Sequence, residues 1–184
     1  MVELQPVSED DRDRLFGWRI DPTVDRWMSD PFAPDRDLHD FWFDHFITSP
    51  DCAGWIIVCS GEPVGFLSLK GLSSPSRGAE WGWYVASLSA RGRGVGRAAQ
   101  ALGLDLAFDV YGLERVWAQV LADNDVALRA QAASGFRREG YLRHHLFKLE
   151  RFHDVVVLGI LANEWKLIRE RVMLSLVRSG LIGA

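Results

Sequence analysis

The segment Arg91–Arg97 places three glycines and three arginines directly before a run of residues with the apolar spacing of a helix. The first turn of a helix leaves N–H groups without acceptors and carries the positive end of the helix dipole. Glycines just upstream of that turn let an anion approach those groups closely. We therefore expect a phosphate site at the start of a helix that ends at about Tyr111, with Gly112 as its stop.

Two common phosphate-binding patterns do not fit this segment. A P-loop requires G-x-x-x-x-G-K-[ST], and no lysine occurs between Lys70 and Lys148, which excludes the P-loop nucleotide-triphosphate enzymes. A dinucleotide fingerprint can be placed on Gly94, Gly96 and Ala99. The strand before it ends a meander, however, and does not open a βαβ unit. A different kind of phosphate ligand is therefore expected.

The pattern R-x-x-G-x-G does fit the segment. Together with "NDVALRAQAASGF" (124–136) and "AEWGWYV" (79–85), it resembles the GNAT superfamily of acyl-CoA-dependent N-acetyltransferases. The resemblance implies acetyl-CoA as acetyl donor, coenzyme A as product, and a loop and helix N-terminus that hold the pyrophosphate. The preceding strand would hydrogen-bond the pantetheine. The coenzyme A residues so implied are Trp83, Tyr84, Val85, Arg91, Gly92, Arg93, Gly94, Val95, Gly96, Arg97 and Asn124.

Direct acetyl transfer needs a deprotonated amine and a donor for the oxyanion of the tetrahedral intermediate. Backbone N–H groups of residues 83–85 are the expected oxyanion donors. Glu80 matches a position at which many family members carry a base that acts on the ammonium, often through water. Its alternative interpretation is an exposed carboxylate on a strand.

The departing thiolate also needs a proton, and here the chain departs from the family pattern. The place at which family members commonly carry a tyrosine as general acid is occupied by Gln131, whose amide cannot supply a proton. Tyr141 is the expected substitute, with His144 and His145 as alternatives. A thiolate can also leave without full protonation, because the pKa of a thiol is only about 8.5.

The acceptor side carries a second, more specific resemblance. Residues 18–42, with "HDVVVLGILANEW" (153–165), are similar to enzymes that acetylate a nucleotide-linked 4-amino sugar in pseudaminic-acid-type biosynthesis. This likeness implies that Arg19 faces the phosphates and that three apolar residues surround the base and deoxy-sugar. Those three residues are Trp27, Met28 and Phe41. They could instead be ordinary core, and Arg19 could simply pair with Asp21 or Asp25.

Three alternative functions stay open. A ribosomal-protein type of N-terminal acetyltransferase shares the "LGIL..EW" pattern of residues 158–165 and would need a peptide groove. An antibiotic- or polyamine-modifying enzyme would need an acidic pocket for a polycation, yet acidic residues are scattered apart from those at 9–11. A non-catalytic acyl-CoA-binding module, suggested by Gln131, would bind coenzyme A without turning over an amine.

Composition limits the class of protein. The 184 residues, 48% of them hydrophobic, suit one packed domain. A net charge of −4 argues against a nucleic-acid-coating protein. Cys52 and Cys59 are too few for a disulfide framework, and no His or Cys spacing suggests a metal site. The first ten residues do not look like a signal peptide, and the apolar run 155–162 is too short to span a membrane. We expect a cytoplasmic protein whose partner is a small-molecule amine, foremost a sugar nucleotide, and not a nucleic acid or a membrane. A helix at 163–178 could form a homodimer.

The pattern of apolar residues predicts one mixed α/β layer with an antiparallel meander. The resemblance then implies an α/β (α+β) single-domain GNAT fold, with a mixed central sheet flanked by helices. Residues 1–52 would form a first strand and the acceptor-side helices, and 30–34 a loop. Residues 53–136 would hold the sheet and the acetyl-CoA site, and 137–184 two closing strands and a last helix. Expected strands are 2–7, 54–60, 64–72, 78–86, 113–122, 140–147 and 153–161, and expected helices are 8–18, 22–28, 35–48, 95–111, 124–134 and 162–177.

Overall fold

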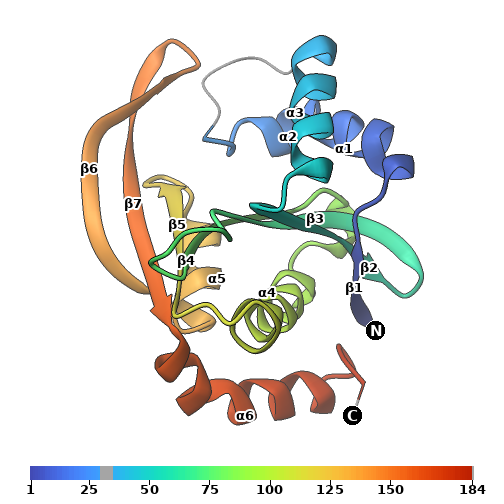
Figure 1. Ribbon diagram of the computed structural model, residues 1–184, viewed down its shortest axis with the longest axis vertical. Coiled ribbons are helices and arrows are strands. Elements are labelled where there is room, and N and C mark those ends of the chain that lie inside the picture. The colour runs from blue at the N-terminus through green and yellow to red at the C-terminus, as the bar shows by residue number, and fades with distance from the viewer. Residues whose placement is uncertain (30–34, 184) are drawn as a thin grey trace.

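A seven-stranded sheet in the order β1-β2-β3-β4-β5-β7-β6 runs through the middle of the molecule in the computed structural model, which describes residues 1–29 and 35–183 (Figure 1). Neighbouring strands are antiparallel except β4 and β5, which are parallel. The predicted mixed sheet with an antiparallel meander is confirmed. The strands are β1 (Val2–Pro6), β2 (Cys52–Cys59), β3 (Glu62–Lys70), β4 (Gly78–Val85), β5 (Arg115–Leu121), β6 (Arg137–Lys148) and β7 (Arg151–Leu161).

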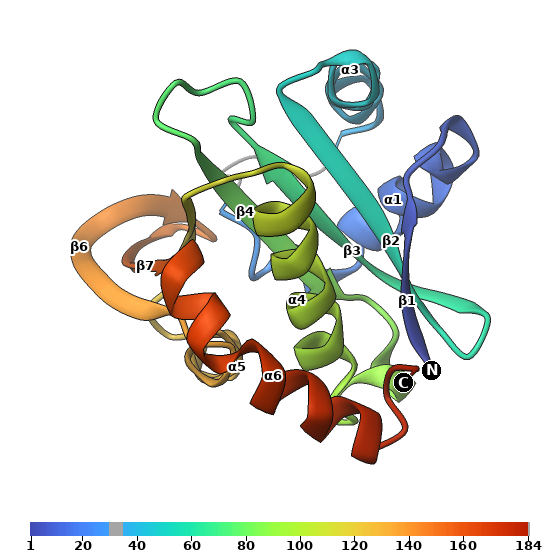
Figure 2. The ribbon, with the colours of Figure 1, turned by 60° about the horizontal axis from the view of Figure 1, so that its bottom comes forward.

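Helices cover both faces of this sheet, as Figure 2 shows. One face carries the first three helices, which come from the N-terminal quarter of the chain, and the other face carries the last three. The helices are α1 (Arg12–Arg19), α2 (Pro22–Asp25), α3 (Arg36–Thr48), α4 (Val95–Asp105), α5 (Asp125–Ala133) and α6 (Ala162–Arg178). The predicted loop at 30–34 lies outside the described residues.

Alternate side chains of β4 pack against two different hydrophobic clusters, one on each face of the sheet. Successive side chains of a strand point to opposite faces of the sheet. Trp81 and Trp83 belong to the larger cluster under α4 and α6, whereas Tyr84 packs against the smaller cluster under α1 and α3. Glu80 therefore lies on the same face as Tyr84, the face of the N-terminal helices.

The helix predicted to run to Tyr111 changes its winding before it ends. The α-helical part stops at Asp105, and Leu106–Val110 continues as a π-helical turn. Gly112 follows with a φ of 61°, a left-handed conformation that glycine adopts without strain. The predicted stop is thus in place, although the last turn is wider than an α-helix.

The closing hairpin is longer than the sequence predicts. Strands β6 and β7 extend to Lys148 and Arg151 because a two-residue turn joins them. Leu149 and Glu150 both have positive φ angles, 52° and 60°, as in the type I′ turns that match the twist of a hairpin. The turn lacks the Asn-Gly or Asp-Gly signature, and so it could not be located from the sequence. Figure 1 shows the hairpin reaching from the sheet toward α2.

The two ends of the described chain lie together (Figure 2). The N–H of Val2 donates to the carbonyl of Leu181 at 2.6 Å. Across residues 1–29 and 35–183, no helix is long and apolar enough to cross a membrane, and no cluster of His, Cys, Asp or Glu could hold a metal ion.

Candidate functional site

A cleft of about 1040 Å³ opens where β4 and β5 part. The two strands pair only from Gly78 and Arg115 to Glu80 and Trp117. Beyond Glu80, β4 remains paired with β3 alone, so its other edge faces the cleft. Backbone groups of residues 81–84 and the N–H of Val85 have no β5 partner, and those that lie along that edge are available to a ligand. This is the geometry that the sequence-based assignment of oxyanion and pantetheine donors requires.

The glycine-arginine loop lines one end of this cleft. Gly92 and Gly94 have φ angles of 73° and 83°, and Gly94 is the N-cap of α4. The N–H groups of the first helical turn therefore point toward the cleft end without acceptors inside the helix. The Val95 side chain is buried in the core, so only its backbone can serve an anion. The loop fits a phosphate.

Arg91 lines the cleft, and its guanidinium also makes contacts within the protein. Its guanidinium donates to the carbonyl of Val85 at 2.8 Å, to the carbonyl of Ala86 at 3.3 Å and to Thr23 Oγ1 at 3.1 Å. These contacts tie the loop to the end of β4 and to α2. Arg91 thus positions the loop. Arg91 and Arg97 both line the cleft, whereas Arg93 is exposed outside its lining.

Two of the glycines are required by packing within the protein itself. A Cβ on Gly94 would come within 2.7 Å of the Leu181 side chain, and one on Gly96 within 2.8 Å of the Trp83 ring. The sequence-based argument considered only the approach of a phosphate to the N–H groups. The structure adds that the loop is pressed between β4 and the C-terminal segment.

Gln131 belongs to a buried polar network beneath the cleft. Its side chain is 2% exposed. With the amide oriented so that donors meet acceptors, its oxygen accepts from Nε1 of Trp81 at 3.1 Å and of Trp83 at 3.2 Å. Its nitrogen donates to Oε1 of Gln100, itself fully buried, at 3.0 Å. Gln131 therefore fixes the two indole rings that form the floor of the cleft.

The expected acid, Tyr141, is not in the cleft, which corrects the prediction. Strand β6 is the edge strand, and β7 separates it from β5. The Tyr141 hydroxyl donates to Asp154 Oδ2 at 2.7 Å, and this hydrogen bond raises the pKa of Tyr141. His144 stacks on Phe152 at 5.4 Å, and His145 is exposed. None of the three lines the cleft.

Tyr84 is the tyrosine that does line the cleft. Its ring meets Trp18 edge to face at 6.2 Å and Phe66 at 6.1 Å. Burial raises the pKa of Tyr84, with Arg19 nearby opposing the shift, so the phenol stays neutral and able to donate a hydrogen bond. The alternation of Glu80, Gly82 and Tyr84 on β4 was the sequence signal for this orientation.

The acceptor half of the cleft is formed by the N-terminal helices. Arg19, Trp27 and Met28 line it as expected, and Asn124, on the opposite wall, caps α5 through the N–H of Ala127 at 3.1 Å. Cleft-lining residues that the sequence analysis missed are Phe16, Arg26, Asp35, Leu38, His39, Trp42 and Lys70.

Phe41 is a second correction. It is 77% exposed and does not line the cleft. Helix α3 buries His39, Phe43 and Phe46, and at about 100° per residue Phe41 falls on the opposite side of the helix. Its neighbour Trp42 lines the cleft in the place that was expected for Phe41.

His39, on the buried side of α3, also lines the cleft. Burial lowers the pKa of His39, which keeps the imidazole neutral where its Nε2 meets the carbonyl of Arg12 at 3.0 Å.

Asp21 and Asp25, named from the sequence as possible partners of Arg19, each make further contacts of their own. Asp21 accepts from the N–H of Thr23 at 2.7 Å as the N-cap of α2, and this bond lowers the pKa of Asp21. Asp25 pairs with Lys148 at 3.1 Å.

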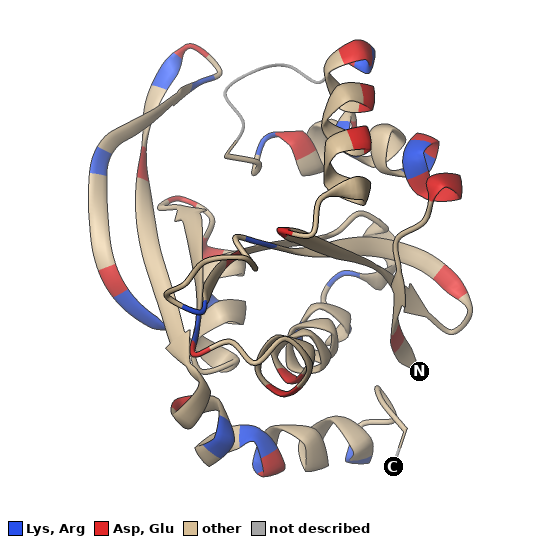
Figure 3. Cartoon of the chain, in the orientation of Figure 1, with Lys and Arg blue, Asp and Glu red and all other residues tan. Residues whose placement is uncertain are grey.

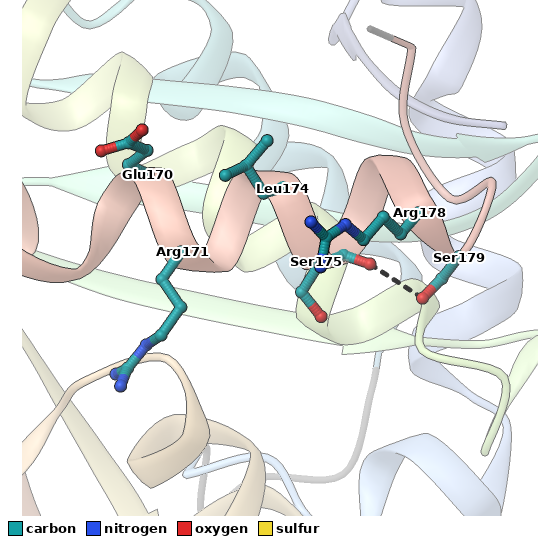
Figure 4. Close-up of a pocket in the computed structure, with 6 residues that line it drawn as sticks. All are labelled: Glu170, Arg171, Leu174, Ser175, Arg178 and Ser179. Carbon is teal, nitrogen blue, oxygen red and sulfur yellow. Dashed lines mark hydrogen bonds between the residues drawn. The ribbon is translucent and has the colours of Figure 1, made fainter.

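A second, smaller pocket of about 460 Å³ is lined only by residues of α6 and by Ser179 at its end (Figure 4). It shares no lining residue with the cleft.

Sequence and structure comparisons agree on the family. Residues 2–137 match the family described as "Acetyltransferase (GNAT) domain". The chain belongs to the GNAT acetyltransferase family. It is an N-acetyltransferase of the GNAT fold, and acetyl-CoA is its acetyl donor.

Individual relatives cover most of the chain. The spermidine N(1)-acetyltransferase of Escherichia coli (strain K12) is 24% identical over 165 residues, which cover 89% of this chain and 88% of that protein. The Bacillus subtilis (strain 168) protein called "Putative ribosomal N-acetyltransferase YdaF" is 29% identical over 110 residues, 60% of each chain. The Vibrio cholerae spermidine N-acetyltransferase, solved with CoA and spermine, superimposes with a TM-score of 0.81 at 19% identity, covering 90% of this chain and 98% of that one.

Gly94→Ala tests the anion loop against a matched glycine. Gly61, in the turn between β2 and β3, has nearly the same φ of 84° but no atom within 4 Å of an added Cβ. Both variants carry a left-handed alanine, which costs about 1 kcal/mol. We expect calorimetric titration to show coenzyme A affinity about tenfold weaker in Gly94→Ala and unchanged in Gly61→Ala. Equal affinities in the two variants would refute the loop assignment.

Gln131→Met tests the buried network. The change leaves two indole N–H groups without their acceptor, which should lower the free energy of unfolding by about 1–3 kcal/mol. Because no proton leaves this position, the pH profile of kcat should keep its shape. Urea unfolding and pH-rate measurements check both expectations, with Gln119→Met as a control from the cleft wall. Loss of one limb of the pH profile would contradict this expectation and show that Gln131 takes part in proton transfer.

Proposed function

We propose that this enzyme acetylates the amino group of a nucleotide-linked amino sugar by direct attack on acetyl-CoA. The charge of the acceptor half supports this proposal above all. Among the described residues, three cationic side chains line it, Arg19, Arg26 and Lys70, against the two carboxylates of Asp35 and Glu80. An acceptor with phosphates is attracted by this arrangement, whereas a polycation is repelled. Figure 3 shows how most other charged residues gather on the outer helices and the hairpin.

The aromatic side chains support a planar ligand. Phe16, Trp27 and Trp42 line the acceptor half together with the neutral imidazole of His39. The Arg26 guanidinium lies 4.7 Å from the centre of the Trp27 ring. A nucleotide base has a flat apolar face that such rings bind, and its sugar and phosphates need the neighbouring donors.

Glu80 is the candidate base. It lies on the face of β4 that borders the acceptor half, opposite Lys70 of β3 in the strand register. A carboxylate in this place can take a proton from the ammonium, directly or through a water, so that the free amine attacks. The unpaired edge of β4 would then donate backbone N–H groups to the oxyanion.

No tyrosine of the expected motif is present to protonate the thiolate. Tyr84 is the neutral hydroxyl of the cleft, and it can donate a hydrogen bond to the acceptor or to a water. The thiolate itself is a sufficiently weak base, with a pKa of about 8.5, to depart with little protonation. Gln131 is thus compatible with turnover.

Spermidine is the second candidate acceptor, favoured by the names of the relatives. The likeness covers 89% of this chain in the Escherichia coli protein. The cleft nevertheless offers only Asp35 and Glu80 as carboxylates among its described residues. A polyamine would need further negative charge to offset the three cations.

An acceptor panel distinguishes these possibilities. Release of coenzyme A thiol from acetyl-CoA would be followed with a UDP- or dTDP-linked 4-amino-4,6-dideoxy sugar, with spermidine, and with a peptide ending in Ser or Ala. We expect turnover confined to the sugar nucleotides, because only these match the cations and rings of the cleft. Faster turnover of spermidine or the peptide would overturn the proposal.

Glu80→Gln tests the base. We expect kcat/KM to fall by about 10²–10⁴-fold at neutral pH. The loss should shrink at pH values above the pKa of the acceptor amine, where the substrate arrives deprotonated. A pH-rate profile of both proteins checks this, with Asp35→Asn as the control carboxylate. An unaltered profile in Glu80→Gln would remove Glu80 as the base.

A further inference from the structure

Lys148, at the tip of the β6–β7 hairpin, is buried against the acceptor-side segment. Its side chain is only 4% exposed. Its Nζ donates to the carbonyl of Asp25 at 2.6 Å, to Asp25 Oδ1 at 3.1 Å and to the carbonyl of Met28 at 3.2 Å. One ammonium thus joins parts of the chain that lie 123 residues apart in sequence.

The segment it holds has little stability of its own. Helix α2 has four residues, too few to persist without tertiary contacts. The positive charge of Lys148 lies at its C-terminal carbonyls, where a cation is favourable. Neither Lys148 nor Asp25 lines the cleft, whereas Trp27 and Met28 do.

The tip of the hairpin is itself held in place by contacts with the sheet. His153 is 6% exposed, and its Nε2 contacts the carbonyl of Lys148 at 3.1 Å. Asp123, which follows β5, also pairs with Arg151 at 2.8 Å, but both side chains are exposed, so this ion pair adds little to the fixing of the hairpin. The position of the ammonium is therefore set by the sheet, and through it the wall of the acceptor half is set by the sheet as well.

We propose that Lys148 is a positioning residue for acceptor binding: it holds Trp27 and Met28 in place by anchoring the carbonyls of the turn that carries them. This inference rests on the proposed location of the acceptor between α2 and β4. It does not depend on which amine is the acceptor. The donor site is formed by the glycine-arginine loop, which Arg91 fixes to the carbonyls of Val85 and Ala86 as well as to α2, so acetyl-CoA binding should depend little on Lys148.

The test is a set of three variants. Lys148→Met removes all three hydrogen bonds, and Asp25→Asn removes the negative charge but keeps an oxygen that can accept from Nζ. Arg151→Ala removes an exposed ion pair at the same hairpin tip. Steady-state kinetics would use the amine of the panel that the wild type acetylates fastest. We expect the acceptor KM to rise about tenfold or more in Lys148→Met, less in Asp25→Asn, and not in Arg151→Ala. The KM for acetyl-CoA should stay within about twofold in all three.

Hydrogen exchange separates this proposal from the proposed function. Faster amide exchange confined to residues 22–28 in Lys148→Met is expected. If no amine of the panel is acetylated, the proposed function fails, while protected amides at 22–28 would still overturn the anchoring role. An unchanged acceptor KM in folded Lys148→Met, or an equal rise in both KM values, would also overturn it. Should Lys148→Met fail to fold, Asp25→Asn and Lys148→Arg decide by the same criteria.

Discussion

The parting of β4 from β5 after Glu80 is the constraint on which the rest of the structure depends. A sheet normally satisfies both edges of an internal strand, and here one edge of β4 is left without a neighbouring strand. The gap provides backbone donors and acceptors at the centre of the molecule. It must also be kept open, because the strands would otherwise pair further.

Side chains on both faces keep the gap open. On one face, Gln131 links the indoles of Trp81 and Trp83 and so holds α5 against β4. On the other, Tyr84 packs with Trp18 and Phe66 under α1. The close fit of Gly96 to Trp83 then carries the position of β4 to the helix that would face the pyrophosphate. The donor site and the floor of the cleft therefore pack as one rigid unit.

The fold was accessible from the sequence because its signals are local. Alternating apolar residues marked the strands, and glycines marked the loop and the end of the long helix. What was missed depends on contacts distant in sequence. Nothing near Arg91 shows that its guanidinium reaches Thr23, 68 residues earlier in the chain, and Tyr141 is far from the cleft because β7 intervenes in the strand order.

The acceptor side was harder to predict for the same reason. Apolar spacing on α3 indicates a buried face but not whether Phe41 or Trp42 reaches the cleft. Lys70 and Tyr84 enter it only because their strands are neighbours in the meander. Specificity therefore resides in pairings across the sheet, which a single sequence does not display.

The joining of Val2 to Leu181 has a consequence for local unfolding. Leu181 packs against Gly94, so the segment that follows α6 contacts both β1 and the anion loop. Proteins open in small segments far more often than they unfold as a whole. An opening confined to this segment would therefore loosen the anion loop while the seven-stranded sheet stays intact.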